Sequence, residues 1–95
     1  MPAYVILNIE VTDPERFAEY AKTGAPTVAQ YGGRYLARGG RAEKLEGGLE
    51  PRRVVVIEFD TADRARAWWA SGEYGVPKAV RQSAARSDVI LVEGV

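Results

Sequence analysis

The residues of this 95-residue chain that could do chemistry are a short set of polar, charged and aromatic side chains. An arginine can hold a carboxylate through two parallel hydrogen bonds, and a carboxylate in an apolar setting can act as a general base. A tyrosine can donate a proton, and aromatic rings can wall an apolar pocket, so together these groups suit a small-molecule site. We take Glu58 and Arg38 as candidate catalytic residues, and Asn8, Tyr20, Trp68, Tyr74 and Arg81 as candidate substrate-binding residues.

Structural explanations compete with these roles. Tyr20 and Trp68 fall on the core-facing spacing of their helices, so packing alone would account for both. Arg81 could cap or pair at the end of a helix, and Arg38 could pair across an interface between subunits. The glycine pair after Arg38 indicates a tight turn or a bulge, because the helix-opening spacing of a nucleotide-binding loop is missing.

The residue types that are missing exclude several kinds of site. The chain has no cysteine and no histidine. Thiol nucleophiles, disulfides, cysteine-based zinc sites and iron–sulfur clusters are therefore excluded, as are serine–histidine–aspartate triads and histidine-ligated haem. No group of acidic residues has the spacing of a metal-binding loop. We expect no metal and no cofactor, and any catalysis must use carboxylate, arginine, lysine or hydroxyl groups.

Charge and hydropathy limit the partners of the protein. The 13 basic and 13 acidic residues cancel, whereas a nucleic-acid-binding protein usually carries an excess of positive charge. A base-stacking sheet is also disfavoured, since the central strands offer only Tyr4 and Phe59 as aromatics. No apolar run approaches the roughly 20 residues that cross a bilayer. The segment "MPAYVILNIE" has no basic region before its apolar residues, so we expect no signal peptide and a cytoplasmic location.

The first half of the chain predicts a strand, a helix and a second strand. Alternating apolar residues indicate a strand over 3–11. Thr12 with Glu15 fits a capping box, Asp13 is an alternative cap, and Pro14 suits the first helical turn. The motif "TGAP" at 23–26 should kink or briefly break this helix, and the glycine pair at 32–33 should end it.

The second half predicts two more strands and a second helical region. After a strand over 34–40 and a polar, turn-rich stretch over 41–51, the run "RRVVVIEF" indicates a central strand over 52–59. A helix should cover 60–71, followed within 71–85 by a turn and a short helix restarting at Pro77, and then by a strand over 87–94. This β-α-β-β-α-β order is the α+β, ferredoxin-like pattern. We expect one domain over 1–95, with a four-stranded antiparallel sheet, both helices on one face, and strands one and three at its centre.

The face of the sheet opposite the helices should be covered by a second subunit. Strands three and four are apolar on both parities, and a face that carries Ile6, Val54 and either Val89 or Ile90 is too apolar to remain in water. We therefore predict a homodimer in which two sheets pack face to face, as in a dimeric α+β barrel.

Polar residues on that covered face would need hydrogen-bond partners. Asn8 and Glu58 could face one cavity, with Arg34 and Arg38 on strand two as the available partners. The alternative is that Glu58, and more so Glu10, lies near a strand end, is solvated or pairs with an arginine, and only fixes the register of the strands.

Several motifs resemble those of the domain-of-unknown-function family 1330. The similar stretches run over essentially the whole length and read "VTDPERFAEY", "YGGRYLARGG", "EKLEGGLEPRRVVVIEF", "AWWASGEY" and "LVEGV". The family pattern falls on Asp13, Tyr20, Gly32, Gly33, Arg38, Gly39, Gly40, Glu58, Phe59, Trp68, Ser71, Tyr74 and Arg81. The chain departs from it at Tyr31, where relatives commonly have histidine, and at Trp69, where another aromatic is usual.

The resemblance implies a fold but no activity. It implies a dimeric α+β barrel, in a superfamily that also holds small antibiotic-biosynthesis-type monooxygenases and muconolactone-isomerase-like proteins. Two functions are open. One is a protein that binds a small acidic or aromatic molecule between sheet and helices, with or without cofactor-free catalysis. The other is a non-catalytic dimeric accessory or ligand-sensing module. The sequence does not decide whether the protein is an enzyme.

Overall fold

The computed structural model describes residues 1–95 and has the element order β-α-β-β-α-α-β. The strands and helices are β1 (Ala3–Val11), α1 (Pro14–Gln30), β2 (Arg34–Arg38), β3 (Arg53–Phe59), α2 (Ala62–Ala70), α3 (Gly72–Ala84) and β4 (Ala85–Glu93). The four strands form one antiparallel sheet in the order β2-β3-β1-β4. The predicted ferredoxin-like fold is therefore confirmed, with β1 and β3 at the centre of the sheet. None of the helices is long and apolar enough to cross a membrane.

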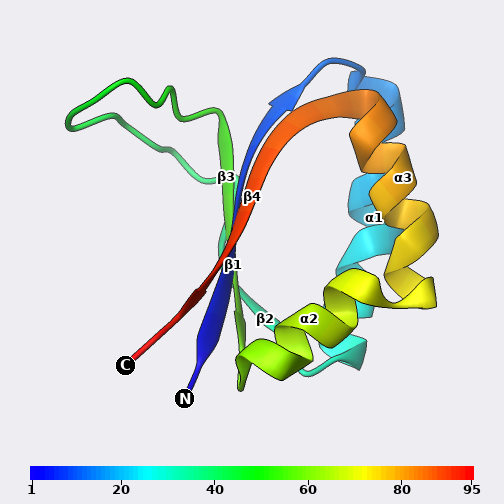
Figure 1. Cartoon of the computed structure of the whole chain (residues 1–95). Helices are drawn as coiled ribbons and strands as arrows, with labels where there is room; N and C mark the ends of the chain where they lie inside the picture. Colours follow the sequence, from blue (N-terminus) through cyan, green and yellow to red (C-terminus); the bar gives the residue numbers. More distant parts are fainter.

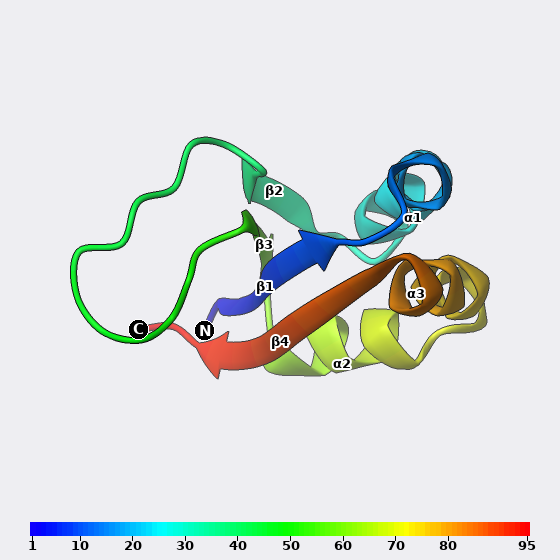
Figure 2. The same cartoon turned by 90° about the horizontal axis from the view of Figure 1, so that it is seen from above.

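All three helices lie against one face of the sheet, and the other face is open (Figure 1). The view from above shows the same two layers, with α1 and α3 side by side (Figure 2). Alternation along the strands decides which side chains reach the helices. On β1 the residues Val5, Leu7 and Ile9 are buried, while their neighbours are only partly buried.

The core lies between the sheet and the helices. β3 contributes Val55, Ile57 and Phe59, and the helices contribute Phe17 and Val28 from α1, Ala65 and Trp68 from α2, and Tyr74 and Ala84 from α3. Trp68, Tyr74 and Phe59 are the largest fully buried side chains. Aromatic contacts connect these elements, because Trp68 of α2 packs against both Phe59 of β3 and Tyr74 of α3.

A helix break near Pro26, one of the two alternatives predicted there, and a helix restart at Pro77 are both absent from the structure. α1 runs without a break through Pro26, and α3 begins at Gly72, so that Pro77 lies inside it and does not start it. A proline removes one backbone donor, and the rest of the helix can persist when its ends are well capped. The caps are present: the Asp13 carboxylate accepts from the Arg16 N–H at 3.2 Å, and Ser71 Oγ accepts from the Tyr74 N–H at 3.1 Å.

Residues 39–52 form an exposed arm with no strand, in agreement with the polar, turn-rich stretch predicted over 41–51. β2 ends at Arg38 and not at residue 40, and the arm extends from the sheet on the side away from the helices (Figure 1). Asn8 holds the base of the arm through two hydrogen bonds. The Asn8 side-chain amide donates to the Glu50 carbonyl at 2.9 Å, and the Asn8 side-chain oxygen accepts from the Arg52 N–H at 2.8 Å. Asn8 thus has its hydrogen-bond partners within the protomer.

The glycine pair after α1 meets two different requirements. Gly32 has a φ of 78°, a left-handed conformation that ends the helix, as expected. At Gly33 the requirement is space, since a Cβ there would lie 2.7 Å from Phe59 Cε1 and 2.8 Å from Val28 Cγ1.

We expect Gly33→Ala to lower the free energy of unfolding by about 1–3 kcal/mol, because the added methyl overpacks a contact between α1 and β3. Chemical denaturation at a fixed protein concentration measures the loss. Gly40→Ala is the matched control: it adds the same methyl where no atom lies within 4 Å, and should change stability by less than about 0.5 kcal/mol. Equal effects of the two substitutions would contradict this explanation.

Candidate functional site

Four of the proposed binding residues meet between the helices and the sheet. Trp68 stacks on Tyr74 with ring centroids 4.1 Å apart, and the Tyr20 hydroxyl lies 3.0 Å from the Tyr74 hydroxyl. Arg81 reaches the same place, where its Nε donates to the Tyr74 hydroxyl oxygen at 3.4 Å. Trp68, Tyr74 and Arg81 are at most 2 % exposed. These residues come from α1, α2 and α3, so the cluster forms only when the three helices pack together.

The Trp68 side chain is fully buried, and its indole is fixed by a hydrogen bond, as is usual for a tryptophan of the core. Its indole Nε1 donates to Thr27 Oγ1 at 3.0 Å, and the Thr27 hydroxyl donates in turn to the Gly24 carbonyl at 2.6 Å. The indole N–H therefore has a partner and is not free to bind a ligand. This geometry supports the packing explanation for Trp68 over a binding role.

Tyr20 is a neutral hydrogen-bonding group of the cluster. Burial, and then the neighbouring Tyr74, raise the pKa of Tyr20 far above its usual range. Burial likewise raises the pKa of Tyr35, which faces the helices from β2. Tyr20 is consequently a phenol at any ordinary pH, able to donate a hydrogen bond but unsuited to act as a base.

The two catalytic candidates do not share a cavity. Glu58 lies on the open face of the sheet, where its carboxylate accepts from Arg34 Nε at 2.7 Å. Arg38 lies on the helix-facing side, exposed, with its guanidinium carbon 4.5 Å from the centre of the Tyr35 ring. The proposed pairing of Arg38 with Glu58 is therefore wrong, because the sheet separates them. Asn8, held by the arm, is also remote from the helix cluster.

Tyr31, at the C-terminal end of α1, links two helices. Its hydroxyl donates to Glu73 Oε1 at 2.9 Å, and the Arg64 guanidinium carbon lies 5.3 Å from its ring centre. Backbone hydrogen bonding, and then this hydroxyl, lower the pKa of Glu73. Tyr31 thus ties the end of α1 to the first turn of α3, which is a structural role.

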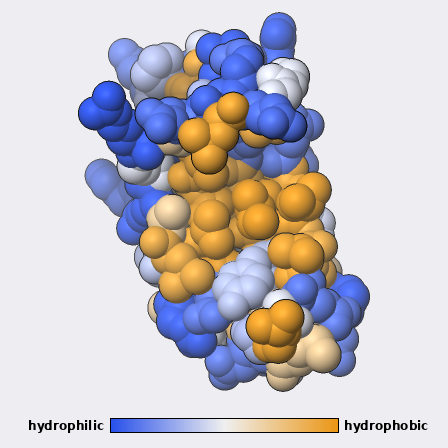
Figure 3. Space-filling view, turned by 90° about the vertical axis from the view of Figure 1, so that its left-hand side faces the viewer, coloured by the Kyte–Doolittle hydropathy of each residue, from blue (hydrophilic) through white to orange (hydrophobic).

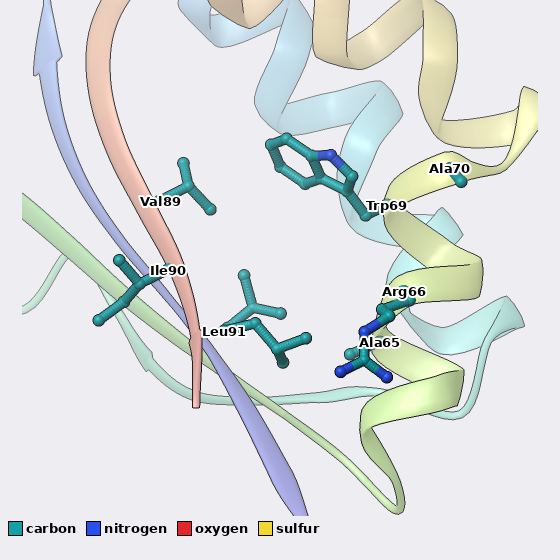
Figure 4. A pocket seen from close by; sticks show the side chains of 8 residues that line it. Ala65, Arg66, Trp69, Ala70, Val89, Ile90 and Leu91 are labelled. Carbon is teal, nitrogen blue, oxygen red and sulfur yellow. The ribbon is translucent and has the colours of Figure 1, made fainter. Parts of the chain in front are cut away.

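An apolar pocket that sequence reasoning did not locate opens between α2 and the edge strand β4. It has a volume of about 430 Å³, and 7 of its 8 lining residues are hydrophobic. Val89, Ile90 and Leu91 line it from β4, and Ala65, Arg66 and Trp69 line it from α2 (Figure 4). The one feature of the sequence that could have indicated this pocket is that β4 has apolar residues on both of its faces. A pocket also needs α2 to stand away from β4, and no local pattern reports that distance.

The open face of the sheet carries an exposed apolar surface, the sheet patch, which consists of Ile6, Val54, Val56, Ile90 and Val92. The registers place Val56, Ile6 and Ile90 in one row across β3, β1 and β4. Ile90 is 58 % exposed and Val92 44 % exposed. Figure 3 shows this continuous apolar area in the middle of the face, with polar side chains around it.

No three acidic residues come together in a way that could hold a metal ion.

Three solved structures with similar folds are distant from this chain in sequence. A protein of unknown function from Rhodopseudomonas palustris has a TM-score of 0.81 at 17 % identity, over 99 % of this chain and 82 % of that one. SnoaB, a cofactor-independent oxygenase from Streptomyces nogalater, has a TM-score of 0.69 at 15 % identity, over 99 % and 93 %. A dimeric ferredoxin-like protein of unknown function from Jannaschia sp. CCS1 has a TM-score of 0.73 at 12 % identity, over 99 % and 100 %.

These similarities show the fold alone. No curated protein matches the chain in sequence. The match to a protein family is different in kind, because it covers nearly every residue of the strands, the helices and the arm. The family's model matches residues 2–95, and the chain belongs to the family described as "Domain of unknown function (DUF1330)".

Proposed function

We propose that the protein is a cytoplasmic homodimer that binds a small organic molecule, acidic or aromatic in character, in the pocket between α2 and β4. The observation that carries the proposal is the pocket itself. Its volume of about 430 Å³ lies within the range of sites for small molecules, and its wall is almost wholly apolar. Trp69 presents an aromatic ring to it, and Arg66 places one cationic side chain at its edge (Figure 4).

The sheet patch supports the dimer. The protomer exposes 5924 Å² of surface. A monomeric protein of 10.4 kDa is expected to expose about 5400 Å². The excess fits a chain with an uncovered sheet face and an extended arm. A second copy is the occupant that we propose, since the similar fold from Jannaschia is that of a dimeric protein and a closed dimer uses the same patch on both subunits.

The lining of the pocket favours a protein that binds its ligand without catalysing a reaction. Arg66 is the single polar residue of its lining, and neither Tyr20 nor Tyr74 lines it. A ligand-sensing or accessory role follows from such a site. Cofactor-free oxygenation is the second candidate, favoured by the similarity in fold to the oxygenase from Streptomyces nogalater. Oxygen uptake in the presence of a bound ligand separates the two.

We expect Val89→Phe to weaken ligand binding by about tenfold or more, because the larger ring fills part of the pocket that Val89 lines. The measurement is protein-observed NMR with a set of benzene- and naphthalene-derived alcohols, amides and acids. The wild type should show shifts confined to α2 and β4.

Val76→Phe is the matched control for this prediction. Val76 is an exposed valine of α3 that lines none of the cavities described for the protein, so the same substitution there should leave binding unchanged. The proposal fails if no compound of the set binds, or if the shifts in the wild type fall outside the pocket.

A further inference from the structure

Arg81 is a buried charge without a counter-charge. Arg81 is 2 % exposed, and it takes part in none of the ion pairs of the protein. The one side-chain hydrogen bond of Arg81 goes from Nε to the Tyr74 hydroxyl oxygen at 3.4 Å, and its Nη2 is buried with no partner. Burying an unpaired charge is costly, so native proteins normally pair such a group or use it.

Aromatic rings surround the guanidinium and do not neutralise it. Its central carbon lies 5.7 Å from the centre of the Trp69 ring and 5.9 Å from that of Tyr20. Ring faces attract a cation weakly, by about 0.5–2 kcal/mol each. A full negative charge is the partner that this environment lacks, and an anion that enters from solvent can supply it.

Arg81 faces a second cavity, which adjoins the apolar pocket. This cavity has a volume of about 300 Å³, and its lining includes Arg81, Ser87, Trp69 and Val89. Trp69 and Val89 also line the apolar pocket, so the two spaces meet along a shared wall. Ser87 Oγ is buried and without a hydrogen-bond partner, and apart from Arg81 Nη2 no other side-chain nitrogen or oxygen is in that position. The two residues that carry these unpaired atoms, Arg81 and Ser87, both line this cavity.

We propose that Arg81 and Ser87 form a carboxylate-binding subsite, and that the ligand is an amphipathic monocarboxylic acid whose apolar part occupies the pocket between α2 and β4. This inference rests on the proposed function and specifies the ligand class of the same site. The carboxylate accepts hydrogen bonds from Arg81 Nη2 and from the Ser87 hydroxyl. Its apolar part passes Trp69 and Val89 into the neighbouring pocket.

A carboxylate suits this subsite better than a phosphate. One guanidinium supplies one positive charge, which balances a single carboxylate, whereas a phosphate monoester at neutral pH brings between one and two negative charges. The remaining walls offer Trp69, Ala85 and Val89 with one amide side chain, Gln82, and no second cation. An additional uncompensated negative charge there would face the same burial cost that Arg81 now has.

The test compares acids with their neutral amides. Phenylacetate, 3-phenylpropionate and 4-phenylbutyrate, each with its amide, are titrated against the wild type by calorimetry at neutral pH. We expect at least one acid of the series to bind about tenfold or more tightly than its amide. Arg81→Met should abolish this preference, and Ser87→Ala should reduce it. Because Arg81→Met removes an unpaired buried charge at similar volume, the ligand-free variant should remain folded and at least as stable as the wild type.

Arg64→Met is the control for a general loss of positive charge. Arg64 is exposed on the same helix as Arg66 and lines none of the cavities described for the protein, so its loss should leave the preference for acids intact. Arg66→Met tests the other cation near the ligand, which lines the apolar pocket and pairs with Asp63 at 3.1 Å. A preference that disappears with Arg66 and persists without Arg81 overturns the inference. Equal binding of acids and amides by the wild type also overturns it and leaves the proposed function standing. If neither acids nor amides bind, both proposals fail.

Discussion

Trp68→Ala should lower the free energy of unfolding by about 3–5 kcal/mol, the range found when a buried large aromatic side chain is truncated. The indole is fully buried, stacks on Tyr74 at 4.1 Å between ring centres and packs against Phe59 at 5.6 Å. Its Nε1 also donates to Thr27 on α1. One side chain of α2 therefore contacts α1, α3 and the sheet, so its removal leaves a cavity where four elements meet. The whole free energy of unfolding of a small domain is only about 5–15 kcal/mol, so the expected loss is a large share of it.

Denaturant unfolding followed by circular dichroism, at one fixed protein concentration, measures the loss. Trp69→Ala is the matched control, since the neighbouring indole is half-buried and lines the pocket. It should cost clearly less. Trp68→Phe keeps a ring in the stack but removes the hydrogen bond to Thr27, and should cost an intermediate amount. A Trp68→Ala loss no larger than that of Trp69→Ala would show that the stack does not join the helices to the sheet.

Strict alternation made the central strands predictable. Val5, Leu7 and Ile9 share the buried parity of β1, and the β-branched run of β3 pairs with it in the centre of the sheet. Period-two patterns and cap residues act locally, so they can be read without the tertiary structure. The aromatic spacing of the helices likewise predicted that Tyr20 and Trp68 face the core, and both pack there.

The candidate site was harder to predict than the central strands, because a bulge in β2 changes the face of the sheet on which the later side chains of that strand lie. With uniform alternation, Arg34 and Arg38 would lie on the same side of β2 and both could reach Glu58. The register shifts between Tyr35 and Ala37, so Arg34 pairs opposite Glu58 while Arg38 lies opposite Val55, facing the helices. An extra residue in a strand moves every later side chain to the other face, and nothing in "RYLAR" marks which residue is extra.

The buried charge of Arg81 could not be located from the sequence for a related reason. An arginine in the last turn of a helix usually stabilises that end and reaches solvent. Here α3 leads directly into β4, and Trp69 and Tyr20 close around the guanidinium from two other helices. Burial of this group depends on the packing of three segments that are distant in sequence, which no local pattern encodes.

Ile6→Lys should convert the proposed dimer into monomers. Ile6 lies at the centre of the sheet patch, between Val56 on β3 and Ile90 on β4. In a two-fold symmetric dimer the substitution occurs twice, and each buried unpaired ammonium costs several kcal/mol. A total of about 4 kcal/mol already raises the dissociation constant about a thousandfold. Light scattering during size-exclusion chromatography at about 10 µM should therefore give twice 10.4 kDa for the wild type and 10.4 kDa for the variant.

Two further variants separate dissociation from unfolding. Val76→Lys places the same charge on an exposed apolar residue of α3, away from the sheet patch, and should leave the dimer intact. Ile90→Lys acts at a position that is already 58 % exposed in the protomer, so it should preserve the fold by circular dichroism and still prevent association. A wild type that elutes as a monomer at this concentration rules out the dimer. A dimer that survives both sheet substitutions would instead place the interface on another surface, and the apolar sheet patch would then need a different occupant.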